Sequence, residues 1–549
     1  MLRTERRTVA DPWWTEVYES RGLLTRERLG YSLTSAARRW PDREFILFEG
    51  RRLTYHELAR WAIRVAADLV SRGVRPGDRV LVQAPNRPEV AILQFAAWRI
   101  GAIAVPVIPV YRQHELRHIV ADAKPRVIVA VPRHGARRPC AELDEIATEV
   151  RVEPVVKYAL DAVDDASAWR QLPRCPSGAS DATEYGLPAP AAPGDCHLIL
   201  YTSGTAAAPK GAMLTGAGIL SNCASMARSL GLTERDVFVA GSPIAHVAGM
   251  SMGVLLPMSL GARTVMLPSW NADAAATLIE HEKATFMSSA PVFLSDLVER
   301  YEAGAGRAHR LSTYMAGGAA TPPSLISRAE AVGVKASRIY GMTETAGVCS
   351  MARADDPLER RSHTDGRPVF GTDIEIVGPD RRPVPLGEVG EVRLRSPQLM
   401  TSYTDRAASA RQLDTDGWFY PGDVGQIDAS GWFTMTGRTK DIINRGGEKF
   451  SAQDIEHALA SHPAISVAAV VGAPNDRYGE VVAAAIQLRA GVAWEGPDSI
   501  LRHLEEQRLA KQKMPVQWYV LEEIPMTATG KIQKQKLLEM ISDGSLVAL

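Results

Sequence analysis

The chain has 549 residues, more than one hydrophobic core normally organises, so we expect more than one domain. Apolar residues make up 46% of the chain and charged residues 23%, which is ordinary for a globular protein. Lys plus Arg number 63 and Asp plus Glu also number 63, so the formal net charge is zero. This balance provides no broad basic field that would indicate nucleic acid or an anionic membrane as a partner.

The cysteines and the N-terminus indicate a cellular compartment. The five cysteines are scattered without metal-ligand spacing, which is typical of reduced thiols in a reducing compartment. Residues 1–14 are charged and lack the apolar block of a signal peptide, and no uncharged run approaches the ~18 residues of a membrane span. We therefore expect a cytoplasmic protein without a membrane span, and assembly into homodimers is left open.

The first third of the chain alternates helix and strand signals. Thr54 and Glu57 form a capping-box pair that begins an apolar helical stripe, and Gly73 ends it. This alternation, with short links, predicts a mostly parallel, doubly wound sheet. Further elements are expected as strands at 79–83, 102–108, 126–131 and 197–201 and as a helix at 92–100.

Two changes of character suggest the domain organisation. Residues 173–193 are rich in Pro, Gly, Ser, Asp and Ala, which predicts an exposed loop between two α/β lobes of one large unit. Beyond Gly437, Ser451 and Asp454 begin a helix that stops at Pro463. Strands at 465–471 and 481–488 and a helix at 499–509 complete a small α+β domain of the usual size.

The run from Tyr201 to Gly211, Tyr-Thr-Ser-Gly-Thr-Ala-Ala-Ala-Pro-Lys-Gly, follows a buried strand. Hydroxyls and free backbone N–H groups donate hydrogen bonds, and Lys210 adds positive charge, so the run suits a polyphosphate. It is not the GxxxxGK[ST] nucleotide loop, because no Ser or Thr follows the lysine. Taken alone, the run is also compatible with an ordinary polar surface loop. Its phosphate-binding candidates are Thr202, Ser203, Gly204, Thr205 and Lys210.

This run resembles the phosphate loop of the adenylate-forming superfamily, which includes acyl-CoA synthetases, luciferases and peptide-synthetase adenylation domains. The family pattern is Thr-Ser-Gly-Thr-Thr-Gly-x-Pro-Lys-Gly, whose second Thr and following Gly are replaced here by Ala206 and Ala207. One hydroxyl donor is thereby lost, and the loop should be stiffer than with glycine. The resemblance continues through further motifs in the family's order, from about residue 41 to residue 537.

The next motifs resemble those that bind the acid and the adenine. His246, in Pro-Ile-Ala-His-Val-Ala-Gly, matches the wall of the acyl pocket. Gly317, Gly318 and Ala319 match the loop that binds the acyl carboxylate and one face of the adenine, where small residues allow close backbone approach. In Tyr340-Gly341-Met-Thr343-Glu344-Thr, the resemblance implies that the tyrosine stacks on adenine, the threonine bonds the α-phosphate and the glutamate holds Mg²⁺.

Three further motifs resemble the ribose site, the hinge and the catalytic lysine. Asp423, in Tyr-Pro-Gly-Asp, is implied to bind both ribose hydroxyls, as an acceptor-only carboxylate can. Arg438 would support the ribose or a phosphate, and Lys440 stands where the family places its hinge. Lys531, in Thr-Gly-Lys-Ile, would bridge the substrate carboxylate and the α-phosphate during adenylation.

The resemblance also implies a fold and a reaction. The fold is a large α/β N-terminal domain, residues 1–438, with two doubly wound α/β lobes and a small β-barrel-like subdomain, followed by a small mobile α+β C-terminal domain, residues 439–549. The reaction uses ATP and Mg²⁺ to convert a carboxylic acid to an acyl-adenylate, which a thiol then attacks. The small domain would rotate about Lys440 between the two steps.

The thiol acceptor is implied to be coenzyme A. Arg445, Gly446, Gly447 and Lys449 occupy the loop that faces pantetheine in the family. The same run also occurs in stand-alone aryl-acid ligases that load carrier proteins, although their pocket usually has an asparagine where His246 stands. Carrier loading is therefore the alternative function. A second alternative, prompted by Ala206 and Ala207, is a non-catalytic adenylate-binding protein.

Small residues around these motifs predict the size and shape of the acid that is bound. They suggest a pocket for a medium, branched, cyclic or aromatic acid rather than acetate, and the pattern through Trp270 and Phe293 resembles bacterial medium-chain, alicyclic and aryl acyl-CoA ligases. The small residues expected in the pocket are Ala245, Ala248, Gly249, Ala319, Ala320, Ala346 and Gly347.

Overall fold

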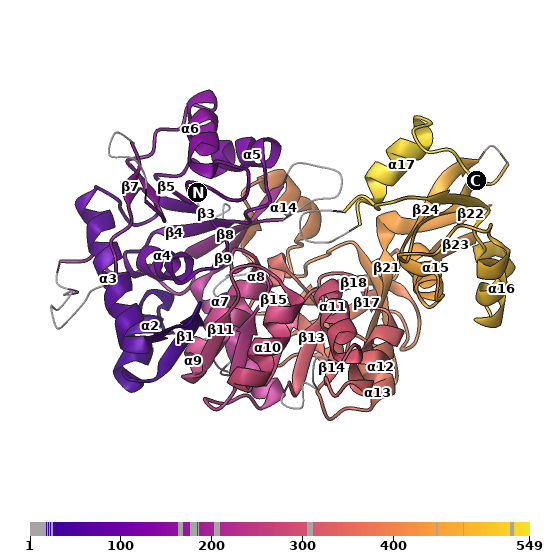
Figure 1. Ribbon diagram of the computed structural model, residues 1–549, viewed down its shortest axis with the longest axis horizontal. Helices are drawn as coiled ribbons and strands as arrows, with labels where there is room; N and C mark the ends of the chain where they lie inside the picture. The colour runs from indigo at the N-terminus through magenta and orange to yellow at the C-terminus, as the bar shows by residue number, and fades with distance from the viewer. Residues whose placement is uncertain are drawn as a thin grey trace.

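The computed structural model describes residues 18, 20, 22, 26–162, 168–175, 184, 186–202, 209–304, 311–445, 448–475, 477–526 and 532–549. The strands of this part of the chain form two large sheets, a small antiparallel sheet and a C-terminal sheet. Figure 1 shows the first three in one large body and the fourth in a smaller body beside it.

The first large sheet has eight strands and is mostly parallel, as the sequence predicts. Only β9 breaks the pattern, because it pairs antiparallel with both of its neighbours. In spatial order the strands are β19 (Ser402–Tyr403), β9 (Lys210–Thr215), β8 (Cys196–Thr202), β4 (Ile103–Val107), β3 (Arg79–Gln83), β5 (Val127–Ala130), β6 (Val156–Ala159) and β7 (Arg170–Gln171). The helices that alternate with them in the chain are α3 (Tyr55–Ser71), α4 (Pro88–Arg99), α5 (Gln113–Ala123) and α6 (Pro139–Glu149).

The second large sheet has nine strands, and its centre is parallel. In order these are β16 (Arg367–Pro368), β15 (Gly347–Met351), β14 (Ala336–Met342), β13 (Thr313–Ala316), β12 (Phe286–Ser289), β10 (Val237–Ala240), β11 (Arg263–Met266), β1 (Glu44–Phe48) and β2 (Arg51–Thr54). The helices in this part are α2 (Leu29–Arg39), α7 (Gly216–Leu230), α8 (Val247–Met250), α9 (Leu256–Leu260), α10 (Ala272–Glu282), α11 (Pro291–Glu302), α12 (Pro323–Ala331) and α13 (Leu358–His363), with a π-helix at Ser251–Leu255.

The small sheet stands where the β-barrel-like subdomain is predicted, and all its pairs are antiparallel. Its strands in order are β17 (Asp373–Val377), β18 (Gly390–Arg395), β20 (Asp423–Ile427) and β21 (Phe433–Arg438), and α14 (Arg406–Gln412) precedes β20. A single 3₁₀ turn, Thr439–Asp441, links β21 to the C-terminal sheet. This short link gives the two bodies one covalent connection of a few residues.

The C-terminal sheet is buried on both faces. Alternate residues of its central strand point to opposite sides, so Val482 and Ala484 join one apolar cluster while Val481 and Ala483 join another. Its strands are β22 (Ile442–Arg445), β23 (Glu448–Ser451), β24 (Ile465–Asn475), β25 (Gly479–Leu488) and β26 (Gln517–Val520). Its helices are α15 (Ala452–Ala460), α16 (Asp498–Glu506) and α17 (Lys534–Ser542), with a 3₁₀ turn at Lys511–Lys513.

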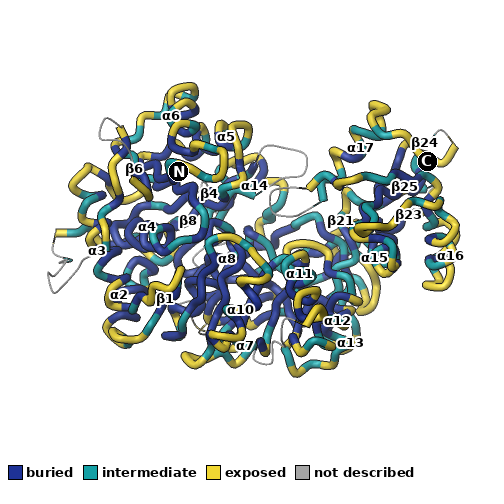
Figure 2. Tube along the Cα trace, viewed as in Figure 1, coloured by how far each residue is buried: buried dark blue, intermediate teal, exposed yellow. Residues whose placement is uncertain are grey.

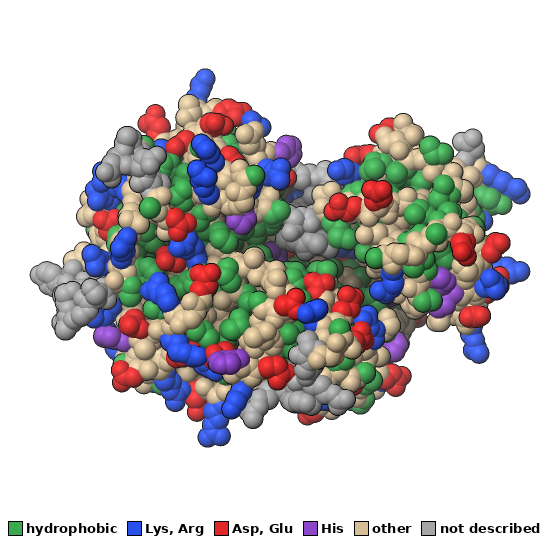
Figure 3. Space-filling view, viewed as in Figure 1, with side chains coloured by type: hydrophobic (Ala, Val, Ile, Leu, Met, Phe, Trp, Pro, Cys, Tyr) green, Lys and Arg blue, Asp and Glu red, His purple; other side chains and the backbone are tan. Residues whose placement is uncertain are grey.

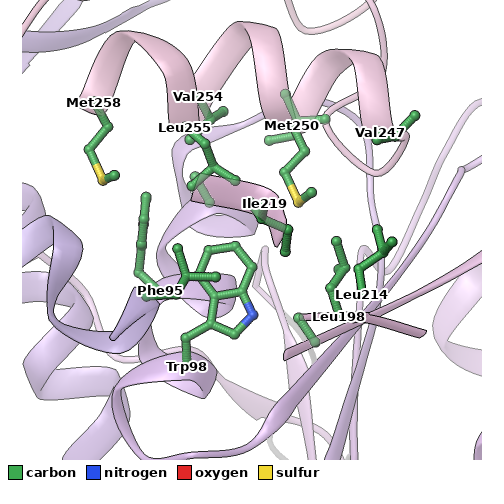
Figure 4. Close-up of a cluster of buried hydrophobic side chains, with 14 of the residues drawn as sticks. Phe95, Trp98, Leu198, Leu214, Ile219, Val247, Met250, Val254, Leu255 and Met258 are labelled. Carbon is green, nitrogen blue, oxygen red and sulfur yellow. The ribbon is translucent and has the colours of Figure 1, made fainter. Parts of the chain in front are cut away.

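The main core joins the two large sheets. Trp98 of α4 is fully buried, stands edge-on to Phe95 at 5.5 Å and donates its indole N–H to the His197 carbonyl at 2.7 Å. Figure 4 shows Met250, from the run of helix that begins at α8, above this indole. Figure 2 shows buried strands inside both bodies and exposed outer faces on most of the helices. The sheets are thus held in fixed relation by side chains, which lets loops from both sheets form one site.

The predicted elements are confirmed with small shifts of their ends. The capping box of Thr54 and Glu57 begins α3, and Ser451 caps α15. The predicted helix at 92–100 begins earlier, at Pro88, because proline suits the first turn of a helix. The place of the 173–193 loop is corrected: it does not separate two lobes, because β7 and β8 on either side of it belong to the same eight-stranded sheet. Hydrophobic periodicity identifies strands but does not show which strands pair with one another. Here β8 pairs with β4, which places it in the first large sheet.

The distribution of surface charge agrees with the composition of the chain. Acidic and basic side chains are interspersed over the face in Figure 3, as expected for a net charge of zero. Within the described ranges, every helix is too short or too polar to cross a membrane.

Candidate active site

A cavity of about 880 Å³ lies where the carboxyl ends of the parallel strands of both large sheets meet. It is lined by residues that follow β3, β4, β10, β11, β12 and β13 and by parts of β14 and β20. In open parallel sheets, ligands bind beyond the carboxyl ends of the strands. The described part of the cavity wall contains the candidates Thr202, Lys210, His246, Gly317, Gly318, Gly341, Thr343, Glu344, Asp423, Arg438 and Lys440.

A buried carboxylate ties the second large sheet to the small antiparallel sheet. Asp423 begins β20 and is only 1% exposed. The Tyr340 hydroxyl of β14 donates to its Oδ2 at 2.7 Å, and Arg438 Nε lies 3.0 Å from its Oδ1. That Oδ1 accepts no hydrogen bond from any described residue, although it is buried. Asp423 Oδ1 is thus ion-paired with Arg438 but retains lone pairs that can accept from a donor such as a ribose hydroxyl.

Tyr340 borders the same position. Its ring lies 5.0 Å from the Phe433 ring, and it is fully enclosed by side chains. Burial, followed by the negative charge of Asp423, raises the pKa of the tyrosine hydroxyl well above its usual value, so it stays a donor at neutral pH. Tyr340 itself is not part of the cavity wall, whereas its neighbour Gly341 is. A Cβ on Gly341 would lie 2.2 Å from the Gly347 carbonyl oxygen, so only glycine fits there.

Glu344 belongs to a second group of polar and charged side chains. The Tyr403 hydroxyl of β19 donates to Glu344 Oε1 at 2.7 Å, and Lys210 Nζ lies 5.1 Å from the centre of the Tyr403 ring. Burial and the adjacent Glu344 charge raise the pKa of Tyr403, so this hydroxyl also remains protonated. Thr343 is buried beside Glu344 in the same 3₁₀ turn. The arrangement places a carboxylate and an ammonium group at one end of the cavity.

The glycine loop follows β13. Gly317 and Gly318 line the cavity, and Gly318 has φ +82°, a conformation that glycine adopts without strain. Ala319 is exposed and does not belong to the cavity wall as described. Of the seven small residues expected in the pocket, Ala245, Ala248 and Gly347 line it.

The prediction of a pocket lined by small residues is therefore only partly right. Gly249 instead packs on the Pro243 carbonyl, and Ala346 is fully buried elsewhere. The apolar part of the wall includes larger side chains, among them Met252, Trp270 and Phe293. Sequence patterns show which residues are small but not which of them face the cavity.

The hinge and the C-terminal candidates differ in position. Lys440 lines the cavity, and burial, followed by the charge of Arg438, lowers the pKa of its amine. Arg445 does not line it: its guanidinium donates to the Gln512 carbonyl at 2.8 Å and lies over the Tyr478 ring. Met526 lines the cavity and pairs with Ile532, the residue after Lys531.

Several candidates lie outside the described residues. They are Ser203, Gly204, Thr205, Ala206 and Ala207 of the phosphate loop, Gly446 and Gly447 of the proposed pantetheine loop, and Lys531. The side chain of Lys449 is likewise outside the description.

Two site residues are not identified by the sequence patterns. Tyr403 orients Glu344 from β19, a strand of two residues that has no periodicity to reveal it. Asn86 lines the cavity and fixes the loop after β10, since it donates to the Ser242 carbonyl at 2.9 Å and accepts from the Ile244 N–H at 2.7 Å. Its position in Pro85-Asn86, just beyond a predicted strand, is the signal that could have identified it.

The comparisons with known proteins agree with this geometry. The family model described as AMP-binding enzyme matches residues 33–404, and that of the AMP-binding enzyme C-terminal domain matches residues 454–531. A medium-chain fatty-acid–CoA ligase from Escherichia coli is 31% identical over 520 residues, covering 94% of this chain and 91% of the relative. A feruloyl-CoA synthase from an Amycolatopsis species is 33% identical over 513 residues, covering 93% and 98%.

A solved structure agrees as well. The ATP-bound MatB from Rhodopseudomonas palustris superposes with a TM-score of 0.81 at 26% identity, covering 94% of this chain and 99% of that one. The chain belongs to the AMP-binding enzyme family, in its acyl-CoA ligase branch.

Replacing Tyr403 with phenylalanine tests how Glu344 is oriented. The variant removes the hydrogen bond to Oε1, and bonds to charged groups contribute about 1.5–3 kcal/mol. We expect acid-dependent ATP–pyrophosphate exchange to fall roughly 10-fold or more and its half-saturating Mg²⁺ concentration to rise. Tyr519→Phe, which removes a hydroxyl bonded to Gln517, is the matched control. An unchanged Mg²⁺ dependence in Tyr403→Phe would show that the bond does not matter.

Proposed function

We propose that the protein activates a carboxylic acid with ATP through an acyl-adenylate and then transfers the acyl group to coenzyme A. The observation that carries this proposal is one cavity that combines a charged end, with Asp423, Glu344 and Lys210, and an apolar end, with Trp270 and Phe293. The relatives named as CoA ligases support the same reaction. The acid is proposed to be of medium length, branched, cyclic or aromatic.

In the first step, a carboxylate oxygen of the acid attacks the α-phosphorus of ATP. The bond between the α-phosphorus and the bridging oxygen to the β-phosphate breaks, and pyrophosphate leaves with that electron pair. We assign the ribose hydroxyls to the carboxylate of Asp423 and the phosphates to Thr343, Lys210 and the phosphate loop. His246 and the loop of Gly317, Gly318 and Ala319 would border the acyl carboxylate. Lys531 would stabilise charge at the α-phosphate, as preorganised cations do in phosphoryl transfer.

Glu344 is the residue proposed to hold Mg²⁺. Nucleotide-bound Mg²⁺ usually takes one or two carboxylates and completes its shell with phosphates and water. Glu344 fits this arrangement, because its carboxylate lines the cavity and is oriented by the Tyr403 hydroxyl. The ion would lower the repulsion between the carboxylate and the triphosphate.

In the second step, the sulfur of the thiol attacks the acyl carbonyl, the bond to the phosphate oxygen breaks, and AMP leaves. We propose that residues 439–549 first rotate about Lys440, which withdraws Lys531 and turns the loop of Arg445, Gly446 and Gly447 toward the cavity. Two observations support a rotation: Arg445 is not part of the cavity wall, and a single 3₁₀ turn links the two bodies. Hinges commonly take this form.

We also propose a cytoplasmic location, supported by five cysteines that are all unpaired.

The experiment that tests the function measures acid-dependent ATP–pyrophosphate exchange over a panel of acids, then adds coenzyme A and detects thioesters by mass spectrometry. We expect exchange with medium-length, cyclic or aromatic acids, little with acetate or palmitate, and a thioester once coenzyme A is added. Exchange without a thioester would indicate a carrier protein as the acceptor. No exchange with any acid would favour a non-catalytic adenylate-binding protein, the reading prompted by Ala206 and Ala207.

Replacing Lys531 with alanine tests the role of that lysine. Loss of one preorganised charge at the transition state typically costs ~10²–10³ in rate, so we expect exchange to fall by that factor. Thioester formation from a pre-formed acyl-adenylate should change far less, because Lys531 is proposed to leave the site first. Lys536→Ala, at an exposed position of α17, is the control. Equal loss in both half-reactions would contradict the two-state proposal.

A further inference from the structure

The apolar end of the cavity is built on three neighbouring strands. Ser242 follows β10, Trp270 follows β11, and Phe293 lies on α11 just after β12. The order along the sheet is β14-β13-β12-β10-β11, so this end is one to three strand spacings from the glycine loop after β13. At ~4.8 Å per strand, the span is roughly 5–14 Å.

Trp270 and Phe293 form a stacked pair at this end. Their ring centroids are 4.5 Å apart and their planes differ by 5°. Both side chains line the cavity and are only partly buried. Aromatic pairs of this kind provide a large, flat contact surface at low cost in conformational entropy. We call these two rings the aryl platform.

Asp296 fixes the orientation of the platform. The Trp270 indole N–H donates to its Oδ2 at 2.8 Å. Asp296 and Phe293 are three residues apart on α11 and therefore share one face of the helix. One short segment thus stacks on the indole and binds its polar edge.

Gly241 limits the platform from the other side. A Cβ at this position would lie 2.9 Å from the Met287 methyl and 3.1 Å from Trp270 Cε3. A larger side chain at the end of β10 would therefore crowd the indole. Stacking, a hydrogen bond and close packing together hold Trp270 in one place.

Among the described residues, the wall of this end holds no acidic or basic side chain besides His246, and Asp296, which bonds the indole, is not part of that wall. The Ser242 and Ser289 hydroxyls share a hydrogen bond of 2.9 Å. A second carboxylate would lose its hydration here without gaining a cation, which is costly. This end therefore favours a neutral acyl group.

We propose that the aryl platform selects acids in which an aromatic ring is separated from the carboxylate by a short carbon chain, as in 3-arylpropanoic and 3-arylpropenoic acids. The proposal rests on the proposed function, which places the carboxylate beside the glycine loop. A ring carried on two carbons reaches farther along the span of roughly 5–14 Å than a ring bonded directly to the carboxylate, and so can overlap more of the platform. Trp270 and Phe293 are the specificity-determining residues, and Asp296 is a positioning residue that acts through Trp270.

The test compares 3-phenylpropanoic, 3-cyclohexylpropanoic and benzoic acids in ATP–pyrophosphate exchange. We expect kcat/KM for the phenyl acid to exceed that for the cyclohexyl acid roughly 10-fold, the upper range for an aromatic contact. Benzoic acid should be a poor substrate. In Trp270→Leu and Phe293→Leu, the ratio of kcat/KM for the phenyl acid to that for the cyclohexyl acid should fall toward one. Phe370→Leu, on an exposed ring outside the cavity wall, is the matched control and should keep the preference.

Asp296 variants separate positioning from folding. Asp296→Asn retains an oxygen that accepts from the indole and should keep the preference, whereas Asp296→Leu should lose it. An equal kcat/KM for the phenyl and cyclohexyl acids in the wild type, or an unchanged preference in both platform variants, would overturn the proposal and leave acid activation intact. Absence of exchange with every acid would instead contradict the proposed function itself.

Discussion

The site depends on one buried carboxylate. Asp423 is held by the Tyr340 hydroxyl from the second large sheet and by Arg438 from the adjacent strand of the small sheet. A buried charge is stable only when it is paired, so these contacts lock the two sheets together beside the cavity. Arg438 ends β21, and the hinge turn starts at the next residue. The pair thus borders the proposed nucleotide end of the cavity and lies just before the turn from which the C-terminal body extends.

The cavity divides its chemistry along the edge of the nine-stranded sheet. Charged side chains gather near β14 and β20, where a triphosphate and its cation would be handled. Neutral and aromatic side chains gather near β10, β11 and β12. The charged residues near β14 and β20 do not depend on the shape of the side chains near β10, β11 and β12. Residues that would contact the acid can therefore differ without a change in the residues that would activate it.

Much of the candidate site could be predicted because its residues lie in short motifs. Glu344 and Asp423 belong to separate motifs, each marked by its local pattern, and the structure brings both to the wall of one cavity, where Asp423 accepts from the Tyr340 hydroxyl. Tyr403 could not be predicted, because it reaches Glu344 from a strand of two residues, which is too short to show a periodicity. The strand order was equally hidden. The pairing of β1 with β11, more than 200 residues apart, depends on packing of the whole domain rather than on local periodicity.

The proposed reaction cleaves ATP between its α- and β-phosphates when the acyl-adenylate forms, and it releases AMP when coenzyme A takes the acyl group. It is tested most directly by quantifying every product of a single reaction with acid, ATP, Mg²⁺ and coenzyme A. The account predicts AMP, pyrophosphate and acyl-CoA in equal amounts, with none formed when the acid is omitted. Formation of ADP and inorganic phosphate in place of AMP and pyrophosphate would contradict it.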